Sequence, residues 1–462
     1  MILAIDQGTT GTTCLVVDGD LIVHGRGYRP VEQHYPRPGW VEHDPEQLWE
    51  SVTGSSADAL ADAGAAAGDL TAIGITNQRE TTLLWDRRTG RPVDRAIVWQ
   101  DRRTAEASAQ LPADLIRERT GLVPDAYFSA TKLAWLLERV ASGRDGLAFG
   151  TVDTWLVWRL TGGAAHITDP TNASRTLLWS LSARDWDDQL LGLFGVDRGL
   201  LPDVVPSSGT VAEASLLGAS MPVAGIAGDQ QAALFGQGCT EPGQAKVTYG
   251  TGSFLLVNDG DRLDEAPRGL VRTAIAQPGW TALEGSVFVA GAAVQWLRDG
   301  LGVLTDAAES ERLAASVPDN GGVHFVPALT GLGSPWWDAD ARGMISGLTR
   351  GASRAHVVRA ALEAIAYQVR DVVEAVPGGV SALRADGGAA ENGWLMQFQA
   401  DLLGMPVEVA PEREMTALGA AALAAGHPPA QRSGAVYEPE MSRDQADALY
   451  RGWLAAVQRA RA

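Results

Sequence analysis

The chain has 462 residues, which predicts two or three domains, and its 45% hydrophobic and 20% charged residues are typical of globular proteins. The formal net charge of −19 argues against nucleic acid or an anionic membrane as a partner, so an anionic ligand would need a local site of backbone N–H groups or a metal ion. Cys14 and Cys239 lie far apart and indicate neither a disulfide framework nor a zinc site. We expect a cytoplasmic protein without membrane insertion, because Asp6 follows Met1 too closely for a signal peptide and the apolar runs are short.

The first hundred residues alternate short β-rich runs with turns and one long helical stretch. We predict strands at residues 2–5, 14–17, 21–23, 72–76, 82–85 and 97–99, a helix from about residue 44 to residue 69, and a helical pattern over residues 131–140. This alternation indicates a mixed α/β domain.

Near residue 238 the pattern begins again. The stretch "VTYGTGSFLLV" within residues 246–257 predicts strand, turn and strand, as the opening of the chain does, and hints at a second domain of similar build. An amphipathic helix over residues 358–376, a strand at 382–385, a Gly turn with a helix, and a final helix at about 443–459 follow. Because no flexible linker divides the halves, we expect domains at residues 1–238 and 239–462, packed around a cleft.

The stretch "DQGTTGTT" at residues 6–13 has two interpretations. A Gly/Thr turn can aim several N–H groups and hydroxyls at one point and so bind phosphate, with Asp6 beside it for Mg2+. It can equally be a plain hairpin with solvated threonines. The Walker pattern, GxGxxG, HRD and DFG are all absent, so a nucleotide would be held on another scaffold.

Asp229 lies in "GIAGDQQAALFGQG", between an apolar strand-like run and an apolar helix-like run. It could act as a general base for a hydroxyl, or cap the following helix, which is the commoner role of Asp at such a position. The flanking glycines and Gln230 favour close approach by a ligand and raise the weight of the catalytic interpretation.

Arg79 and Glu80 follow another strand-like run in "GITNQRETTLLWD". Together they offer donors and acceptors to neighbouring hydroxyls of a polyol, but an adjacent Arg/Glu pair is more often a weak surface ion pair. Trp99, Tyr127 and Phe254 could form the wall of a small pocket, although most buried aromatic residues belong to the core.

Taken together, these stretches resemble the FGGY carbohydrate kinases of the actin/Hsp70/sugar-kinase superfamily. The matching segments, which cover nearly the whole chain to about residue 425, include "DQGTTGTT", "YPRPGWVEHDP", "GITNQRETT", "AIVWQDRRTAE", "TDPTNASRT", "GIAGDQQAALFGQ", "TYGTGSF", "LEGSVFVAGAAVQWLRD" and "RADGGAAENGWLMQFQADLLG". Within the family, "NQRETT" and "PGWVEHDP" are typical of the members that phosphorylate glycerol. The resemblance implies an α/β fold of two RNase H-like, actin-like ATPase domains with an interdomain cleft. It also implies transfer of phosphate from ATP to glycerol, giving sn-glycerol 3-phosphate and ADP, as the first step of glycerol catabolism.

The resemblance also implies roles for individual residues. Asp229 would be the catalytic base, and Asp6 and Asp229 would approach Mg2+. The expected polyol contacts are Arg79, Glu80, Trp99, Tyr127, Asp229, Gln230 and Phe254. The expected ATP contacts are Thr9, Thr10, Gly11 and Thr251 around the phosphates, and Gly291, Gln295, Gly388 and Asn392 beside the nucleotide. A homo-oligomer, dimer or tetramer, is expected.

Three departures from the family pattern stand out. Many relatives have Arg at the position of Thr13, which would reach the phosphates. Members that respond to fructose 1,6-bisphosphate carry a Gly-Gly-Thr-Arg loop where this chain has residues 207–222 without Arg or His, so we expect no inhibition by the bisphosphate and no histidine phosphorylation there. The C-terminal part is short after Pro428 and Pro429, which leaves oligomer contacts open. Two rival functions remain: a kinase for another short polyol or ketose, and an actin- or Hsp70-like nucleotide-binding protein without a phosphoryl acceptor.

Overall fold

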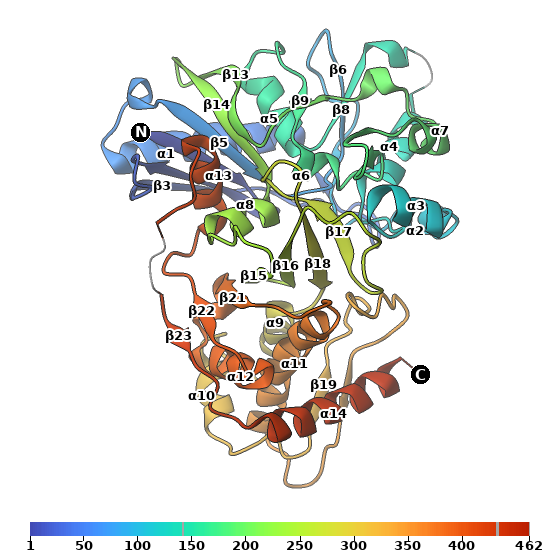
Figure 1. Ribbon diagram of the computed structural model, residues 1–462, viewed down its shortest axis with the longest axis vertical. Coiled ribbons are helices and arrows are strands. Elements are labelled where there is room, and N and C mark those ends of the chain that lie inside the picture. Colours follow the sequence, from blue (N-terminus) through green and yellow to red (C-terminus); the bar gives the residue numbers. More distant parts are fainter. Residues whose placement is uncertain (141–142, 431–433, 462) are drawn as a thin grey trace.

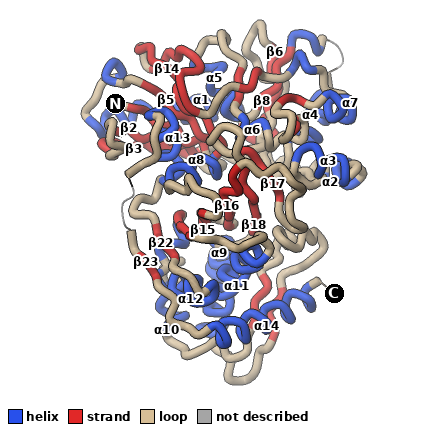
Figure 2. The backbone as a smooth tube through the Cα atoms, viewed as in Figure 1, coloured by secondary structure: helices blue, strands red, loops and turns tan. Residues whose placement is uncertain are grey.

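The computed structural model describes residues 1–140, 143–430 and 434–461. Figure 1 shows two lobes stacked along the long axis of the molecule, each built around its own sheet. Figure 2 shows helices gathered on the faces of these strands in both lobes. The mixed α/β class predicted from the sequence is confirmed.

The first sheet has the order β13-β14-β5-β1-β2-β3. Its strands are β1 (Ile2–Gln7), β2 (Gly11–Val17), β3 (Val23–Pro30), β5 (Ala72–Asn77), β13 (Ser208–Leu216) and β14 (Ala219–Gly228). β1 pairs antiparallel with β2 and parallel with β5, and β5 pairs parallel with β14. Every residue of β5 is buried, as expected for a parallel strand covered on both faces.

The second sheet has the order β17-β18-β16-β15-β21-β22-β23. Its strands are β15 (Gln244–Tyr249), β16 (Ser253–Gly260), β17 (Val271–Ala274), β18 (Thr281–Val287), β21 (Ala382–Asp386), β22 (Val407–Val409) and β23 (Val436–Tyr437). β15 pairs antiparallel with β16 and parallel with β21, as β1 does with β2 and β5. The two sheets therefore repeat one topology, which confirms the two similarly built domains that the two Gly/Thr hairpins suggested.

Helices and short strand pairs surround the sheets. The helices are α1 (Pro45–Ala63), α2 (Ala105–Ala109), α3 (Ala113–Thr120), α4 (Ser129–Leu137), α5 (Val152–Leu160), α6 (Pro170–Ala173), α7 (Asp188–Phe194), α8 (Asp229–Gly236), α9 (Gly291–Asp299), α10 (Glu309–Ala315), α11 (Arg354–Glu374), α12 (Gly393–Leu403), α13 (Met415–Ala425) and α14 (Arg443–Ala460). The short strands pair as β4 (Glu42–His43) with β7 (Ala96–Ile97), β6 (Leu83–Asp86) with β8 (Leu147–Gly150), β9 (Ile167–Thr168) with β12 (Asp203–Val204), β10 (Trp179–Ser180) with β11 (Asp185–Trp186), and β19 (His324–Val326) with β20 (Met344–Ser346).

α13 lies in sequence between β22 and β23 of the second sheet but packs on the first sheet and on α8, in the upper lobe of Figure 1. Glycines allow this close approach. A Cβ on Gly74 would lie 2.1 Å from the carbonyl oxygen of Ala420, and one on Gly419 would lie 1.9 Å from that of Ala232. Since real Cβ atoms do not come so close, larger residues at these two positions would push α13 away from β5 and α8.

Most predicted elements are present, and the differences have local causes. The strand expected at residues 21–23 begins at Val23, because the Asp18 carboxylate accepts hydrogen bonds from the N–H groups of Asp20 and Ile22 and holds a turn. The helix expected to reach residue 69 ends at Ala63, where Gly64 adopts a left-handed φ of 62°.

The cysteines and the helix lengths bear on the predictions made from composition. Both cysteines are buried and free, so no disulfide joins them. Across the described ranges, no helix combines the length and the apolar character that a membrane crossing requires.

Candidate active site

Asp229 is the first residue of α8, at the junction between the first sheet and the second. The N-cap position is taken by Gly228, so Asp229 does not have the capping role that its sequence context also allowed. Its Oδ1 accepts a hydrogen bond from the Gln230 N–H at 2.7 Å and lies 3.2 Å from Nε of Arg79. The side chain is 28% exposed, and its Oδ2 has no hydrogen-bond partner within the described residues. One carboxylate oxygen is therefore fixed while the other is available.

Arg79 and Glu80 follow the end of β5 and are almost completely buried, with side chains 2% and 1% exposed. The interpretation of Arg79 and Glu80 as a surface ion pair, which the sequence allowed, is therefore wrong. Glu80 has a φ of 61°. Residues other than Gly rarely adopt this left-handed backbone conformation, and those that do cluster at functional sites. The turn thus directs the two side chains into the molecule beside Asp229.

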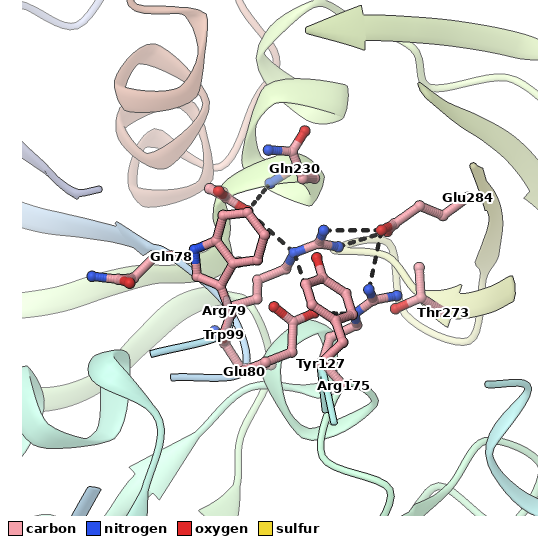
Figure 3. A network of polar contacts seen from close by, with 12 residues as sticks. Gln78, Arg79, Glu80, Trp99, Tyr127, Arg175, Gln230, Thr273 and Glu284 are labelled. Carbon is pink, nitrogen blue, oxygen red and sulfur yellow. Dashed lines mark hydrogen bonds and ion pairs between the residues drawn. The ribbon is translucent and has the colours of Figure 1, made fainter. Parts of the chain in front are cut away.

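Glu284 and Arg175 complete a buried cluster with this pair (Figure 3). Arg79 donates from Nη1 to Oε2 of Glu284 at 2.6 Å and from Nη2 to its Oε1 at 3.0 Å. Arg175 donates to Oε1 of Glu80 at 2.6 Å and to Oε1 of Glu284 at 3.0 Å. Such paired, hydrogen-bonded charges are what a dry interior tolerates.

The charges of this cluster shape one another. Burial opposes ionisation of Glu284, but Arg175 and Arg79 lower its pKa to about 2. Burial also opposes the charge of Arg79, yet Glu284 and Glu80 hold the pKa of Arg79 well above its ordinary value. For Glu80, burial raises the pKa despite the opposing effect of Arg175.

The three predicted aromatic residues lie together. The ring centroid of Trp99 is 5.6 Å from that of Tyr127 and 6.1 Å from that of Phe254, both edge to face. Phe254 comes from β16 of the second sheet, and the other two from the first half of the chain. Trp99 also donates from Nε1 to Oγ1 of Thr9 at 2.9 Å, so the aromatic group touches the first Gly/Thr loop.

The opening stretch forms a hairpin between β1 and β2, closed by a hydrogen bond from the Gly8 N–H to the Gly11 carbonyl at 2.9 Å. Thr10 is exposed at its tip and Thr9 is half-buried. A Cβ on Gly11 would lie 2.7 Å from the backbone carbonyl oxygen of Arg29, so Gly is required there for packing. The geometry is thus a true hairpin that still presents Thr9 and Thr10 at its tip.

Asp6 is the last residue but one of β1, just before this loop. Its surroundings raise the pKa of its carboxyl to about 8, chiefly through burial and further through the charges of Asp229 and Glu414. The charge of Asp229 thus acts on Asp6. Among the described residues, no group of three or more His, Cys, Asp and Glu side chains could hold a metal ion by itself.

The second Gly/Thr loop lies between β15 and β16 and contacts the start of α9. The carbonyl of exposed Thr251 accepts from the N–H groups of Ala290 and Ala292 at 2.9 and 3.0 Å, and Gly291 donates to Gly250 at 3.0 Å. The structure therefore brings Thr251 and Gly291 together, with Gln295 exposed further along α9.

Gly388 and Asn392 follow the end of β21. A Cβ on Gly388 would meet no protein atom within 4 Å, so this residue faces open space. Asn392 caps α12 by accepting from the Leu395 N–H at 3.0 Å and donates to Ser310 at 3.3 Å. The contacts of Asn392 are therefore those of a helix cap, and its contact with the nucleotide stays a prediction.

Gln230 is held by Lys246, a residue that sequence reasoning gave no role. The Lys246 ammonium group donates to Oε1 of Gln230 and, at 2.9 Å, to Oγ1 of Thr248. Lys246 is fully buried, and this burial lowers its pKa to about 8. Because Lys246 belongs to β15, the second sheet orients a side chain of α8.

Two other residues were missed, Arg175 and Glu284. Each is the lone charge in a run of small or apolar residues, "NASRTLL" and "ALEGSV", and such a buried charge demands a partner. That pattern could have indicated that each residue is buried in an ion pair, but it does not indicate the partner.

Access to the cluster is from the Asp229 side, because Arg79, Glu80 and Tyr127 are 2%, 1% and 6% exposed. A separate hollow of about 230 Å³, whose lining includes Leu21, Gln237 and Arg384, contains none of the predicted site residues.

Comparison with known proteins gives consistent matches. The model of the FGGY family of carbohydrate kinases, N-terminal domain, matches residues 1–236, and that of the C-terminal domain matches residues 245–426. Glycerol kinase 2 of Thermotoga maritima is 51% identical over 99% of this chain and 98% of its own length.

Solved structures of related kinases share the fold of this chain. Plasmodium falciparum glycerol kinase with ADP is 34% identical, with a TM-score of 0.90 over 99% of this chain and 98% of its own. A xylulose kinase from Rhodospirillum rubrum is 25% identical, with a TM-score of 0.86 over 99% and 98% of the two chains. The fold is therefore shared by kinases named for different substrates.

Proposed function

This chain belongs to the FGGY family of carbohydrate kinases, and we propose that it transfers the terminal phosphoryl group of ATP to glycerol, forming sn-glycerol 3-phosphate and ADP, the first step of glycerol catabolism. The observation that carries the proposal is the position of Asp229, 3.2 Å from Arg79 and adjacent to the buried Glu80 turn. Relatives named glycerol kinase, about half identical over nearly the full chain, support the choice of substrate.

The polyol lies between the charged and aromatic groups. Arg79, Glu80 and Gln230 supply donors and acceptors for neighbouring hydroxyls. Trp99, Tyr127 and Phe254 give an apolar side against which the carbon chain packs, with the Tyr127 hydroxyl as a further contact. A three-carbon triol offers the hydroxyls and the small size that this arrangement accommodates.

Asp229 is the general base. Its free carboxylate oxygen takes the proton of the attacking hydroxyl while the hydroxyl oxygen forms a bond to the terminal phosphorus of ATP. The bond from that phosphorus to the bridging oxygen breaks, and ADP leaves. The reaction requires mainly in-line positioning and stabilisation of charge, which the base and the loop N–H groups supply.

The two Gly/Thr loops hold ATP. Thr9, Thr10 and Gly11 of the first loop and Thr251 of the second lie around the phosphates. The nucleotide extends over Gly291, Gln295, Gly388 and Asn392 of the second domain. The exposed tips at Thr10 and Thr251, and the open space at Gly388, support this placement.

Asp6 and Asp229 fit a magnesium ion, because the charge of Asp229 adds to the burial that raises the pKa of Asp6, and a divalent cation would neutralise both carboxylates. They are too few to hold it alone, so phosphate oxygens and water complete the set. When bound, Mg2+ neutralises phosphate charge. In its presence Asp6 stays ionised, since the cation favours the carboxylate form.

The limits of the domains at residues 1–238 and 239–462, the homo-oligomeric state and the cytoplasmic location stay predictions. The oligomeric state is measured by light scattering of the purified protein. A monomer at micromolar concentration would contradict the dimer or tetramer.

The decisive experiment is glycerol-dependent ADP formation with Mg2+, run beside dihydroxyacetone, erythritol and xylulose. We expect the highest kcat/KM with glycerol. A higher value with another substrate would favour a kinase for that polyol or ketose. ADP release independent of every acceptor would favour the actin- or Hsp70-like alternative.

A further inference from the structure

Five side chains form an unbroken row of alternating charge: Glu80, Arg175, Glu284 and Arg79, which Figure 3 labels, and then Asp229. Each neighbouring pair is in contact, at 2.6, 3.0, 2.6 and 3.2 Å in that order. The row joins Asp229, the proposed base, at one end to Glu80, whose carboxylate is proposed to bind the polyol, at the other. Two of its three inner members, Arg175 and Glu284, are completely buried.

Glu284 differs from the other four in origin. It lies in the middle of β18 in the second sheet, opposite Leu256 of β16 and Val271 of β17. The other members come from the first half of the chain. The side chains proposed to bind polyol are therefore oriented by a carboxylate from the other domain.

The donors of Arg79 show how closely it is held. A guanidinium has five N–H donors. Three hydrogen bonds use them: Nη1 donates to Glu284 and, at 3.3 Å, to Oε1 of Gln231, and Nη2 donates to Glu284. Nε lies 3.2 Å from Asp229 in an ion pair, and the bidentate pair with Glu284 fixes the plane of the guanidinium.

Arg175 has the corresponding effect on Glu80. It donates from Nε to one carboxylate oxygen of Glu80, and its guanidinium carbon lies 5.5 Å from the ring centroid of Tyr127. The hydroxyls of the neighbouring Ser174 and of Thr273 in β17 share a hydrogen bond of 2.9 Å, which connects this segment to the second sheet. Arg175 thus fixes a carboxylate that the left-handed backbone at residue 80 has already turned inward.

We propose that Glu284 and Arg175 are positioning residues for polyol recognition, Glu284 by orienting the guanidinium of Arg79 across the domain boundary and Arg175 by orienting the carboxylate of Glu80. This inference rests on the proposed function. It adds that the affinity for the acceptor depends on a residue of the second domain buried behind the pocket.

The test compares Glu284→Gln, which keeps the shape of the side chain and removes its charge, with the wild-type protein. KM for glycerol and for ATP, kcat, and glycerol affinity by calorimetry without ATP are measured. We expect KM and the dissociation constant for glycerol to rise about tenfold or more, because a buried arginine loses its partner. KM for ATP should stay within about twofold, since the loops that hold it are untouched.

Asp371→Asn is the matched control. Asp371 is 3% exposed and accepts from Tyr450, Trp453 and Trp336, so it is an equally buried carboxylate that lies outside the row. Its substitution should lower the melting temperature and leave KM for glycerol unchanged. The same pattern in Glu284→Gln would show a merely structural role and overturn the proposal.

Arg175→Lys gives a second, independent readout. It keeps the positive charge but loses the planar fork that joins Glu80 to Glu284, so KM for glycerol should again rise while kcat changes less. If Glu284→Gln does not fold, this variant decides, and an unchanged KM for glycerol overturns the proposal. Failure of the proposed function is a different result, since the wild-type protein would then form no ADP in response to glycerol.

Discussion

Nε1 of Trp99 donates a hydrogen bond to Oγ1 of Thr9 at 2.9 Å, and this contact joins the aromatic side of the proposed polyol pocket to the first Gly/Thr loop. The same indole lies edge to face with Phe254 of the second domain. A side chain expected from the sequence to contact only the carbon chain of the polyol thus also contacts the expected phosphate loop.

Trp99→Phe should therefore raise KM for ATP as well as for glycerol. The phenyl ring keeps the apolar contact but lacks the donor, and one hydrogen bond contributes about 1 kcal/mol, or roughly fivefold. Steady-state kinetics with each substrate varied in turn measure the effect. Thr9→Val removes the same bond from the other side, so in the double variant the two effects on KM for ATP should not add. Full additivity would mean that the contact does not transmit the effect.

Asp229→Asn should fold and bind glycerol but turn over slowly. The amide keeps the size of the side chain and cannot take a proton, and a positioned base contributes about 10²–10⁴-fold to the rate. A loss of this size in kcat, with a melting temperature near that of the wild type, is the expected result. Near-normal kcat would remove Asp229 from the role of base.

Asp6 predicts a pH dependence of stability in the ligand-free protein. The pKa of its carboxyl is 3.8 in the unfolded chain and about 8 in the folded protein, chiefly because of burial. Between these values the folded state holds a proton that the unfolded state has lost, so stability falls as pH rises from about 4 to about 8.

Asp6→Asn lacks this titration. Relative to the variant, the wild-type free energy of unfolding should fall by up to roughly 1.4 kcal/mol per pH unit across the window. Melting temperatures of both proteins at several pH values between 4 and 8 measure the difference. A gap that stays constant with pH would mean that Asp6 is not protonated in the folded state.

Gly388→Ala tests the nucleotide side. The added methyl group meets no protein atom within 4 Å, so stability should be unchanged. If ATP lies against Gly388, its dissociation constant should rise by roughly tenfold, because a methyl group in a filled contact forces the ligand away. Gly68→Ala, which is equally free of neighbours, is the control and should leave ATP affinity unchanged. Equal affinity in the two variants would place the nucleotide elsewhere.

Fructose 1,6-bisphosphate should not inhibit the enzyme. Residues 207–222 contain no Arg, Lys or His, and they form the hairpin of β13 and β14 with Glu213 as its one charged residue. An anionic sugar phosphate would meet no cation there. The assay measures glycerol phosphorylation with and without the bisphosphate at millimolar concentration, and clear inhibition would contradict the prediction.

The sequence predicted most strands and helices because their signals are local. The apolar run at residues 72–76 and the apolar residues at three- and four-residue spacings from Val358 onward each belong to one element, and both appear where expected. The ends were less predictable. The Asp18 turn displaced the start of β3, since a side-chain hydrogen bond competed with strand pairing.

The site divides in the same way. Asp229, Arg79 and Trp99 stand next to glycines or strand ends, where a sequence pattern indicates function. Glu284 lies in the middle of a strand, and its importance comes from a partner more than two hundred positions away. Pairings between distant parts of a chain are set by the packing of the two sheets, which a single sequence does not specify.

α13 has a consequence for the order in which this protein is made. The first sheet is complete in sequence at Gly228, but the helix that covers β1, β5 and β14 ends at Ala425. On the ribosome, at about 5–20 residues per second, every strand of the second sheet except β23 must therefore emerge before the first sheet can be covered. Until then the surface that packs against Leu418 and Ala421 is open to solvent, and we expect chaperones to bind the nascent chain at this stage.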